Sequence, residues 1–169
     1  MINNDILIRL RYALDIKNTD MVEIFKLGGI EVTKDEVLKM LTKPKESYDD
    51  EDDYEVEDDE SMKLNNATLE SFLNGLITFK RGKQEPKPGQ PETPPLSNES
   101  VNNILLKKVK ISLALTSEDM IDILAKAGVT ITKGEIGAIL RKKGHKNYKE
   151  CGDKYARNFL KGLAVKYRG

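Results

Sequence analysis

An all-α fold, built as a tandem duplication of a small four-helix unit, is predicted from three features of this 169-residue chain. Aromatic residues make up only 6% of the chain and tryptophan is absent, whereas β-strands favour aromatic and β-branched residues. Apolar residues recur at helical spacing in several segments. The sequence also matches itself at two fixed offsets, which indicates an internal repeat.

The repeat aligns without gaps over most of its length. Residues 3–41 match residues 102–140 at an offset of 99, with 12 identical positions. Residues 72–82 match residues 159–169 at an offset of 87, so the first copy contains an insertion of 12 residues. We expect the two copies to be related by a pseudo-two-fold axis.

These offsets divide the chain into parts of very different composition. The expected parts are a first repeat at residues 1–84 with an acidic insertion at 43–64, a proline-rich linker at 85–100, and a basic second repeat at 101–169.

The second and third helices of each copy have recognisable start signals. In the first copy, helices are predicted over residues 5–16 and 19–27, the second with Asn18 as its N-cap. Ser117 is the expected N-cap at the corresponding place in the second copy. The third helix begins in both copies with a Thr-Lys-x-Glu capping box, at Thr33 and at Thr132.

The fourth helix of each copy carries an internal glycine, Gly75 or Gly162, within an apolar pattern. A glycine inside a helix costs about 1 kcal/mol relative to alanine. Because it recurs in both copies, we expect it to allow another helix to approach closely.

The zero net charge of the chain conceals a strong asymmetry. Residues 1–84 contain 12 Lys and Arg against 19 Asp and Glu, whereas residues 101–169 contain 15 against 6, giving net charges of −7 and +9. Ten of the twelve residues at 49–60 are carboxylates. Since such a run buries no apolar surface, we expect it and the linker to be mobile. The acidic run either stays solvated or folds back onto the basic copy.

Several classes of protein are excluded by what the sequence lacks. The single cysteine, Cys151, forms no internal disulfide. No apolar run approaches the roughly 18 residues of a membrane span, and the N-terminal residues lack the basic stretch and apolar core typical of a signal peptide, so we expect none. We therefore expect a cytoplasmic protein with no membrane partner and no cofactor.

Four segments of the chain resemble one family. They are the Asn-Asn-x-x-Leu opening, the Gly-[Ile/Val]-x-[Val/Ile]-Thr-Lys turn, residues 145–153, and the Phe-Leu-Lys-Gly-Leu run at 159–163. Together they resemble the YehS-like bacterial proteins, which contain two tandem copies of a helical domain of unknown function. The resemblance implies a cytoplasmic bacterial protein and no particular activity. The acidic insertion and the linker depart from the family pattern.

A candidate functional segment holds the only histidine and the only cysteine. Its residues are His145, Asn147, Tyr148, Cys151, Gly152 and Asp153. A thiol beside an imidazole can act as a nucleophile, so a small enzyme using His145, Cys151 and Asp153 is one interpretation. The other is structural, with His145 and Asn147 capping helices and Cys151 packing as a small apolar residue.

We favour the structural interpretation because no oxyanion-hole signature or glycine-rich substrate loop accompanies the segment. A metal site is not expected either, since zinc sites recruit clustered ligand pairs that this segment lacks. We therefore expect no catalytic residue.

A candidate basic face is formed by Arg141, Lys142, Lys143, Lys146 and Lys149. Such a face would attract phosphates, and Tyr148, Tyr155 and Tyr167 would offer rings for base stacking. However, lysine outnumbers arginine twelve to three in the second copy, which is typical of a solvated helix surface. A helix–turn–helix motif is disfavoured because its spacing is wrong. Ile136, the apolar residue that should pack the second helix of such a motif, lies one or two positions too far along the chain from the turn glycine.

We predict a non-enzymatic binding or adaptor protein with a protein partner. Nucleic-acid binding through the basic second repeat is the alternative, a small enzyme ranks third, and a homodimer stays open. The second repeat alone, residues 101–169, is expected to bind polyanions better than the intact chain, because the acidic run competes with phosphates in the latter.

Overall fold

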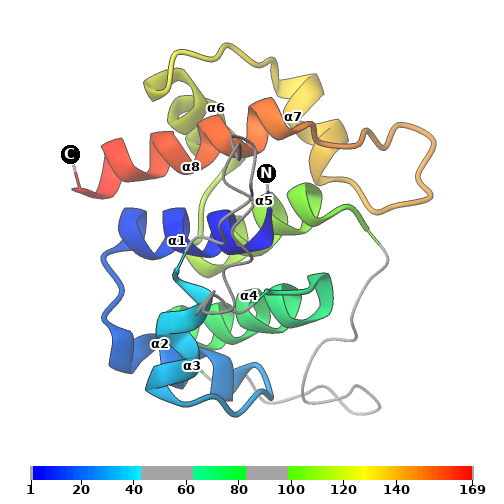
Figure 1. Cartoon of the computed structure of the whole chain (residues 1–169). Helices are drawn as coiled ribbons and strands as arrows, with labels where there is room; N and C mark the ends of the chain where they lie inside the picture. The colour runs from blue at the N-terminus through cyan, green and yellow to red at the C-terminus, as the bar shows by residue number, and fades with distance from the viewer. Residues whose placement is uncertain (1, 43–62, 83–98, 169) are drawn as a thin grey trace, which may run out of the picture.

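A computed structural model of the chain describes residues 2–42, 63–82 and 99–168 (Figure 1). These residues form helices and no strands, which confirms the all-α prediction. The acidic run at 49–60 and nearly all of the linker lie outside the described residues. The helices are α1 (Asn3–Leu14), α2 (Asn18–Leu27), α3 (Lys34–Met40), α4 (Asn66–Arg81), α5 (Val101–Ser112), α6 (Ser117–Lys126), α7 (Lys133–Leu140) and α8 (Asp153–Arg168).

The starts of α2 and α6 differ from the prediction. Thr116, not Ser117, caps α6: its hydroxyl accepts from the Asp119 N–H at 3.1 Å, and the Asp119 carboxylate accepts from the Thr116 N–H at 2.8 Å. Helix α2 begins at Asn18 itself, whose side-chain oxygen accepts from the Arg11 guanidinium at 2.8 Å. Thr116 is favoured as the cap because an acid three residues later completes a reciprocal capping box.

The predicted capping boxes of α3 and α7 are confirmed. The Glu36 N–H donates to the Thr33 hydroxyl at 3.1 Å, and the Thr33 N–H donates back to the Glu36 carboxylate at 3.0 Å. Thr132 and Glu135 repeat this arrangement at 3.1 and 3.3 Å. Each reciprocal cap gives partners to the N–H of the glutamate, one of the four that a helix start leaves unpaired, and to the N–H of the threonine itself.

The recurring glycines lie where two helices touch, as predicted. A Cβ atom added at Gly75 of α4 would lie 1.9 Å from the carbonyl oxygen of Ile24 in α2. A Cβ atom at Gly162 of α8 would lie 1.9 Å from the carbonyl oxygen of Ile123 in α6. No real side chain fits at either distance, so the absence of one sets the spacing of both helix pairs.

The two copies pack through each other. Helix α1 lies mainly against α8 of the second copy, and α5 lies mainly against α4 of the first copy (Figure 1). The helices α1, α4, α5 and α8 therefore form the centre of the molecule. The pair α2–α3 packs on α4 from one side, and the pair α6–α7 packs on α8 and α5 from the other.

When each helix is replaced by its equivalent in the other copy, the same set of contacts results, as a pseudo-two-fold axis requires. The α1–α8 contact becomes α5–α4, and the α2–α4 contact becomes α6–α8. Two arginines at matching positions follow the same rule. Arg168 at the end of α8 donates to the Tyr12 carbonyl oxygen at 3.2 Å, and Arg81 at the end of α4 donates to the Ile111 carbonyl oxygen at 3.3 Å. Each arginine thus binds the C-terminal end of a helix from the other copy, where a cation is favoured.

The core is aliphatic with three fully buried phenylalanines, Phe25, Phe72 and Phe159. The rings of Phe25 and Phe72 lie 4.8 Å apart between α2 and α4.

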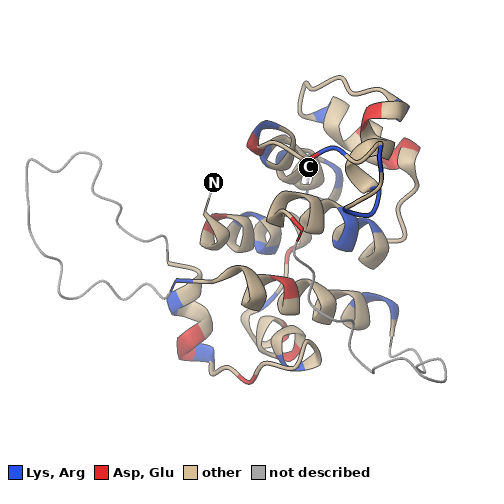
Figure 2. Cartoon of the chain, turned by 90° about the vertical axis from the view of Figure 1, so that its right-hand side faces the viewer, with Lys and Arg blue, Asp and Glu red and all other residues tan. Residues whose placement is uncertain are grey.

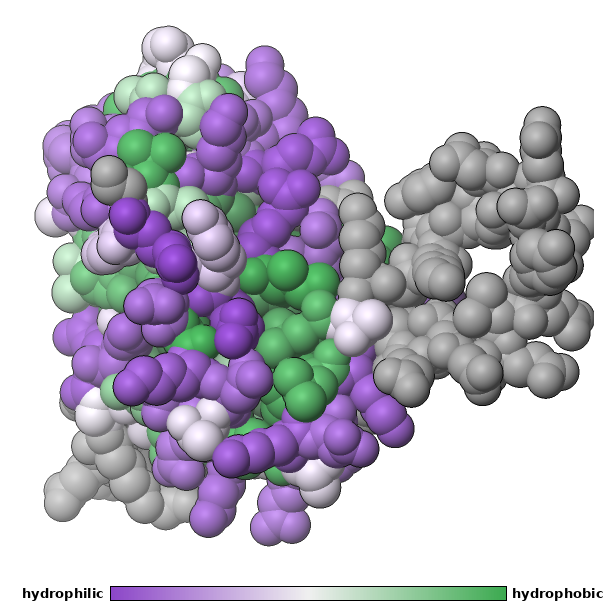
Figure 3. Space-filling view, turned by 60° about the vertical axis from the view of Figure 1, so that its left-hand side comes forward, coloured by the Kyte–Doolittle hydropathy of each residue, from purple (hydrophilic) through white to green (hydrophobic). Residues whose placement is uncertain are grey.

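On the face shown in Figure 3, hydrophobic residues gather in one area bordered by hydrophilic ones. None of the described helices combines the length and the apolarity needed to cross a bilayer.

Candidate functional site

A buried asparagine in α5 positions the candidate functional segment. The side-chain amide of Asn103 donates to the carbonyl oxygens of Ile139 at 3.0 Å and Lys149 at 2.9 Å. Its side-chain oxygen accepts from the Cys151 N–H at 2.7 Å. Because Asn103 is completely buried, these bonds satisfy an amide that would otherwise be costly to desolvate. The segment before α8 is therefore fixed to the start of α5.

Asn102 adds a second attachment at the same place. Its amide donates to the Cys151 carbonyl oxygen at 3.2 Å and to the Asp153 carboxylate at 2.8 Å. The hydrogen bond from Asn102 is the main reason that the Asp153 pKa lies below its ordinary value. Asp153 is the first residue of α8, where a negative charge is stabilised by the helix dipole.

The first copy repeats this clamp at its own opening. Asn4 donates to the Met40 carbonyl oxygen at 2.9 Å and accepts from the Leu64 N–H at 3.0 Å. Asn3 donates to the Leu64 carbonyl oxygen at 3.0 Å and to the Asn66 side chain at 2.7 Å. Leu64 takes the place of Cys151 and therefore belongs to the repeat, which leaves it outside the acidic insertion predicted at 43–64. The Asn-Asn opening, seen in the sequence only as a motif, is a structural clamp.

His145 organises the loop between α7 and α8. Its N–H donates to the Lys142 carbonyl oxygen at 3.0 Å, and its ring Nδ1 accepts from the Asn147 N–H at 3.0 Å. The ring Nε2 lies 3.3 Å from the Arg141 guanidinium. His145 and Asn147 thus bond to each other inside an exposed turn, and the expectation that they cap helices is wrong. A turn with polar side chains satisfies its own backbone in this way.

Cys151 is a core residue in the structure. It is 3% exposed, and its thiol donates to the Gly152 carbonyl oxygen at 3.5 Å. Burial, and to a smaller extent the charge of Asp153, raises the pKa of the thiol to about 12. Among the described residues, His145 and Cys151 share no hydrogen bond, and no three His, Cys, Asp or Glu side chains gather to hold a metal ion.

Tyr148 is half-buried beneath a charged pair. The Lys107 ammonium lies 5.6 Å from the centre of its ring and also pairs with the Glu99 carboxylate. The same carboxylate accepts from the Lys143 N–H at 2.9 Å. Burial alone would raise the pKa of Glu99, but the hydrogen bonds from Lys107 and Lys143 outweigh it and hold the pKa below its ordinary value. Glu99 therefore anchors the middle of the loop to the start of the second copy.

The five residues of the candidate basic face all lie in this loop or at its start. Arg141, Lys142, Lys143, Lys146 and Lys149 are exposed, and Figure 2 shows Lys and Arg positions along the loop. Two lysines of the second copy outside this loop form ion pairs with helix carboxylates. Lys126 pairs with Asp122 at 3.5 Å, and Lys133 pairs with Glu118 at 3.1 Å.

The repeat seen in the sequence and in the fold is also that of a known family. The family described as "Protein of unknown function (DUF1456)" matches residues 3–82 and 102–169. This chain belongs to that family. The uncharacterized protein YehS of Escherichia coli (strain K12) is 38% identical over 167 residues, which cover 98% of this chain and 96% of that protein. No solved structure shows a significant match.

The limits of the two DUF1456 matches coincide with residues that have structural roles here. Each match begins at the first of the two clamp asparagines, Asn3 in the first copy and Asn102 in the second. Each ends one residue after the arginine that binds the other copy, Arg81 or Arg168. The predicted resemblance to YehS-like proteins is confirmed, and it brings no activity with it.

Proposed function

We propose that this DUF1456 chain is a non-enzymatic binding or adaptor protein of the bacterial cytoplasm, and that it docks an acidic segment of a protein partner. The docking surface is the basic loop, defined as residues 141–149. The observation that carries the proposal is the placement of five exposed cations on a backbone that is hydrogen-bonded along its length. Fixing the backbone before binding reduces the ordering entropy that association costs.

The basic loop is held at three places. The Lys149 N–H donates to the Ala138 carbonyl oxygen at 3.0 Å, which closes the loop onto α7. Glu99 accepts from the Lys143 N–H, and the ring of His145 holds the turn between them. These bonds point to a preformed surface of positive charge, which favours fast, salt-sensitive association with an acidic partner.

Nucleic acid is the weaker candidate because the loop offers little to stack a base. The Tyr148 ring has Lys107 over it, and Tyr155 packs against the hydrophobic core. Four of the five cations are lysines, which act as point charges without the bidentate geometry of arginine.

The enzyme alternative loses its nucleophile. A thiol with a pKa of about 12 has very little thiolate near neutral pH, and the thiolate is the reactive form. His145, the only imidazole, is occupied by the turn it organises. Both features support binding over catalysis.

The test uses the full chain and two labelled probes. One is an octaglutamate peptide, and the other is a single-stranded oligonucleotide of similar charge. Fluorescence anisotropy at 50 and 200 mM salt compares the natural chain with Lys142→Glu/Lys146→Glu. The matched control is Lys34→Glu/Lys39→Glu, which reverses two exposed lysines of α3 in the first copy. Binding to the peptide should be salt-sensitive, lost in the loop variant and retained in the control.

Two results would overturn the proposal. If the oligonucleotide binds more tightly than the peptide, with a steeper salt dependence, the loop is a nucleic-acid site. If neither probe distinguishes the loop variant from the control at 50 mM salt, the loop is a solvated surface.

A further inference from the structure

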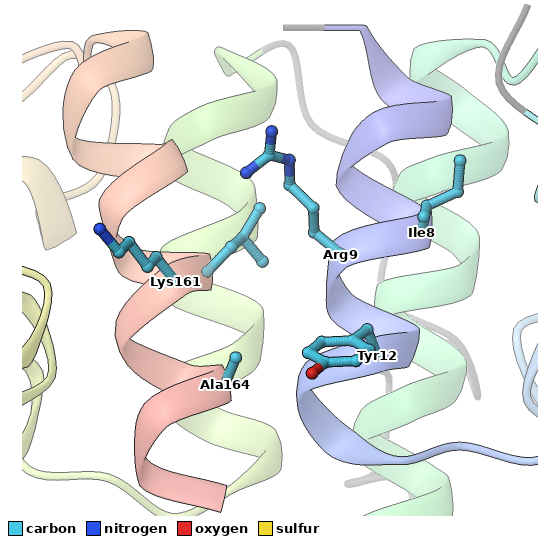
Figure 4. Close-up of a pocket in the computed structure, with 6 residues that line it drawn as sticks. Ile8, Arg9, Tyr12, Lys161 and Ala164 are labelled. Carbon is cyan, nitrogen blue, oxygen red and sulfur yellow. The ribbon is translucent and has the colours of Figure 1, made fainter. Parts of the chain in front are cut away.

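An apolar pocket of about 330 Å³ lies between α1 and α8, away from the basic loop (Figure 4). It is formed where one helix of each copy meets the other, so neither repeat contains it alone. Its lining residues are Ile8, Arg9, Tyr12, Leu160, Lys161 and Ala164.

The lining combines an apolar floor with two cations. Ile8, Leu160 and Ala164 supply aliphatic surface, and the Tyr12 ring lies between the two helices (Figure 4). Arg9 extends from α1 toward α8, whereas Lys161 lies at the outer edge on α8. No carboxylate belongs to the lining. A ligand that suits these walls has an apolar body and one negative charge.

The guanidinium of Arg9 is oriented so that it can bind the negative charge of such a ligand. Its Nε donates to the Asp5 carboxylate at 3.1 Å, which orients the guanidinium, and neither of its Nη atoms donates to another described residue. Two parallel N–H groups of a guanidinium match the two oxygens of a carboxylate. Lys161 makes no ion pair within the described chain, and its ammonium points away from α1 (Figure 4), so Arg9 is the main cation for the ligand and Lys161 acts from a longer distance.

The size of the pocket indicates a small molecule rather than a partner helix. The lining covers residues 8–12 of α1 and 160–164 of α8, which is about 6 Å along each helix at a rise of 1.5 Å per residue. Its volume is at the lower end of the range of about 300–1,000 Å³ for ligand pockets. One ring or a short alkyl chain fills this space.

The matching groove of the other helix pair has different chemistry. Between α4 and α5, Ala164 is replaced by the larger Ile77, and Lys161 is replaced by Asn74, which is 7% exposed and whose side-chain oxygen has no partner among the described residues. Arg9 is replaced by Lys108, whose pKa is lowered mainly by burial. The rim cations and the room left by alanine thus occur together between α1 and α8.

We propose that the α1–α8 pocket binds a small amphiphilic carboxylate, with its apolar body on Ile8, Leu160 and Ala164 and its carboxylate on Arg9. This site is independent of the basic loop, so either proposal stands or fails without the other.

The experiment is a titration of the ¹⁵N-labelled full chain with 4-phenylbutyrate, followed by amide shifts of residues 8–12 and 160–164. The neutral analogue 4-phenylbutan-1-ol keeps the apolar body without the charge. The acid should bind at least about tenfold more tightly than the alcohol, because a hydrogen-bonded charge supplies that preference. Arg9→Met should remove the preference, and Lys161→Met should reduce it. Lys154→Met, an exposed lysine at the start of α8, should leave it unchanged.

A filling variant separates pocket binding from charge attraction at the surface. Ala164→Phe should abolish saturable shifts for both compounds, and its melting temperature shows whether the fold is kept. The proposal is overturned if the acid gives no saturable shifts at these residues. It is equally overturned if acid and alcohol bind alike, or if Arg9→Met binds as the natural chain does.

Discussion

Each copy buries one asparagine amide at the start of its first helix, Asn4 or Asn103, and uses it to hold the chain just before its last helix. The partners are backbone groups 36 to 60 residues away along the sequence. A sequence shows that two asparagines recur, but it does not show which distant backbone groups they meet. For that reason the motif was visible from the sequence and its role was not.

Replacing Asn103 by alanine should lower the free energy of unfolding by about 2–4 kcal/mol, since it leaves one N–H and two carbonyl groups without partners in a buried place. Urea denaturation followed by circular dichroism measures the change. The control is Asn158→Ala, whose side chain donates to the Lys154 carbonyl oxygen within its own helix. This control should stay within about 0.5 kcal/mol of the natural chain. Equal stabilities for the two variants would show that the clamp contributes nothing.

The Cys151 thiol should react with iodoacetamide at pH 8 slower in the folded chain than in urea, by a factor on the order of 100 or more. The pKa is raised to about 12 by burial, so the thiolate fraction in the folded state is small at pH 8. As the pH rises toward 12 the folded-state rate should climb, while the rate in urea levels off earlier. Equal rates in the two states at pH 8 would contradict the burial of this side chain.

At the scale of the helices, local signals predicted most of what the structure shows. A capping box depends on two residues three positions apart, and a close contact between helices depends on a glycine that lacks a side chain. Both features can be recognised in a single sequence. The first helix ends earlier than predicted, at Leu14, because Asp15 adopts a left-handed conformation with φ of 51°. Nothing in the apolar spacing announces that change, since a non-glycine residue seldom adopts it.

Alanine at Gly75 or Gly162 should destabilise the chain by about 3 kcal/mol, because the new Cβ atom would overlap a backbone oxygen and push two helices apart. Thermal and urea unfolding of each variant give the value. Gly137 in α7 is the matched control, since a Cβ atom there meets nothing within 4 Å. Gly137→Ala should raise stability by up to about 1 kcal/mol through helix propensity alone. A similar gain at Gly75 would refute the close contact.

For the whole molecule, the sequence identified two alike copies but not how their helices pair. The apolar pattern marks which face of α1 is buried, and both α8 and α4 carry an apolar face that could cover it. The structure places α1 on α8 and α5 on α4. Residues 101–169 alone would therefore expose the faces of α5 and α8 that the first copy covers, and the isolated second repeat is unsuitable for comparing polyanion binding with the intact chain.

Cutting the chain between the copies should leave the two halves associated. A protease site introduced within residues 83–98 provides the cut, and size-exclusion chromatography in buffer and in urea shows the result. The halves should elute together in buffer because the central helices come from both copies, and they should separate only in urea. Each half purified alone should lack a cooperative unfolding transition. Halves that separate in buffer, or that fold alone as stable monomers, would contradict the interlocked packing.

The pairing of α1 with α8 also governs how the protein is made. About 140 residues separate the end of α1 from the start of α8, and at roughly 5–20 residues per second the ribosome needs about 7–28 s to add them. Throughout that interval the growing chain has an apolar helix whose main partner does not yet exist. Leu7 and Leu10 of α1 are fully buried in the folded chain, yet α8 follows all the other described helices in the sequence. A chain whose translation stops before α8 would lack the helix that covers most of the buried face of α1.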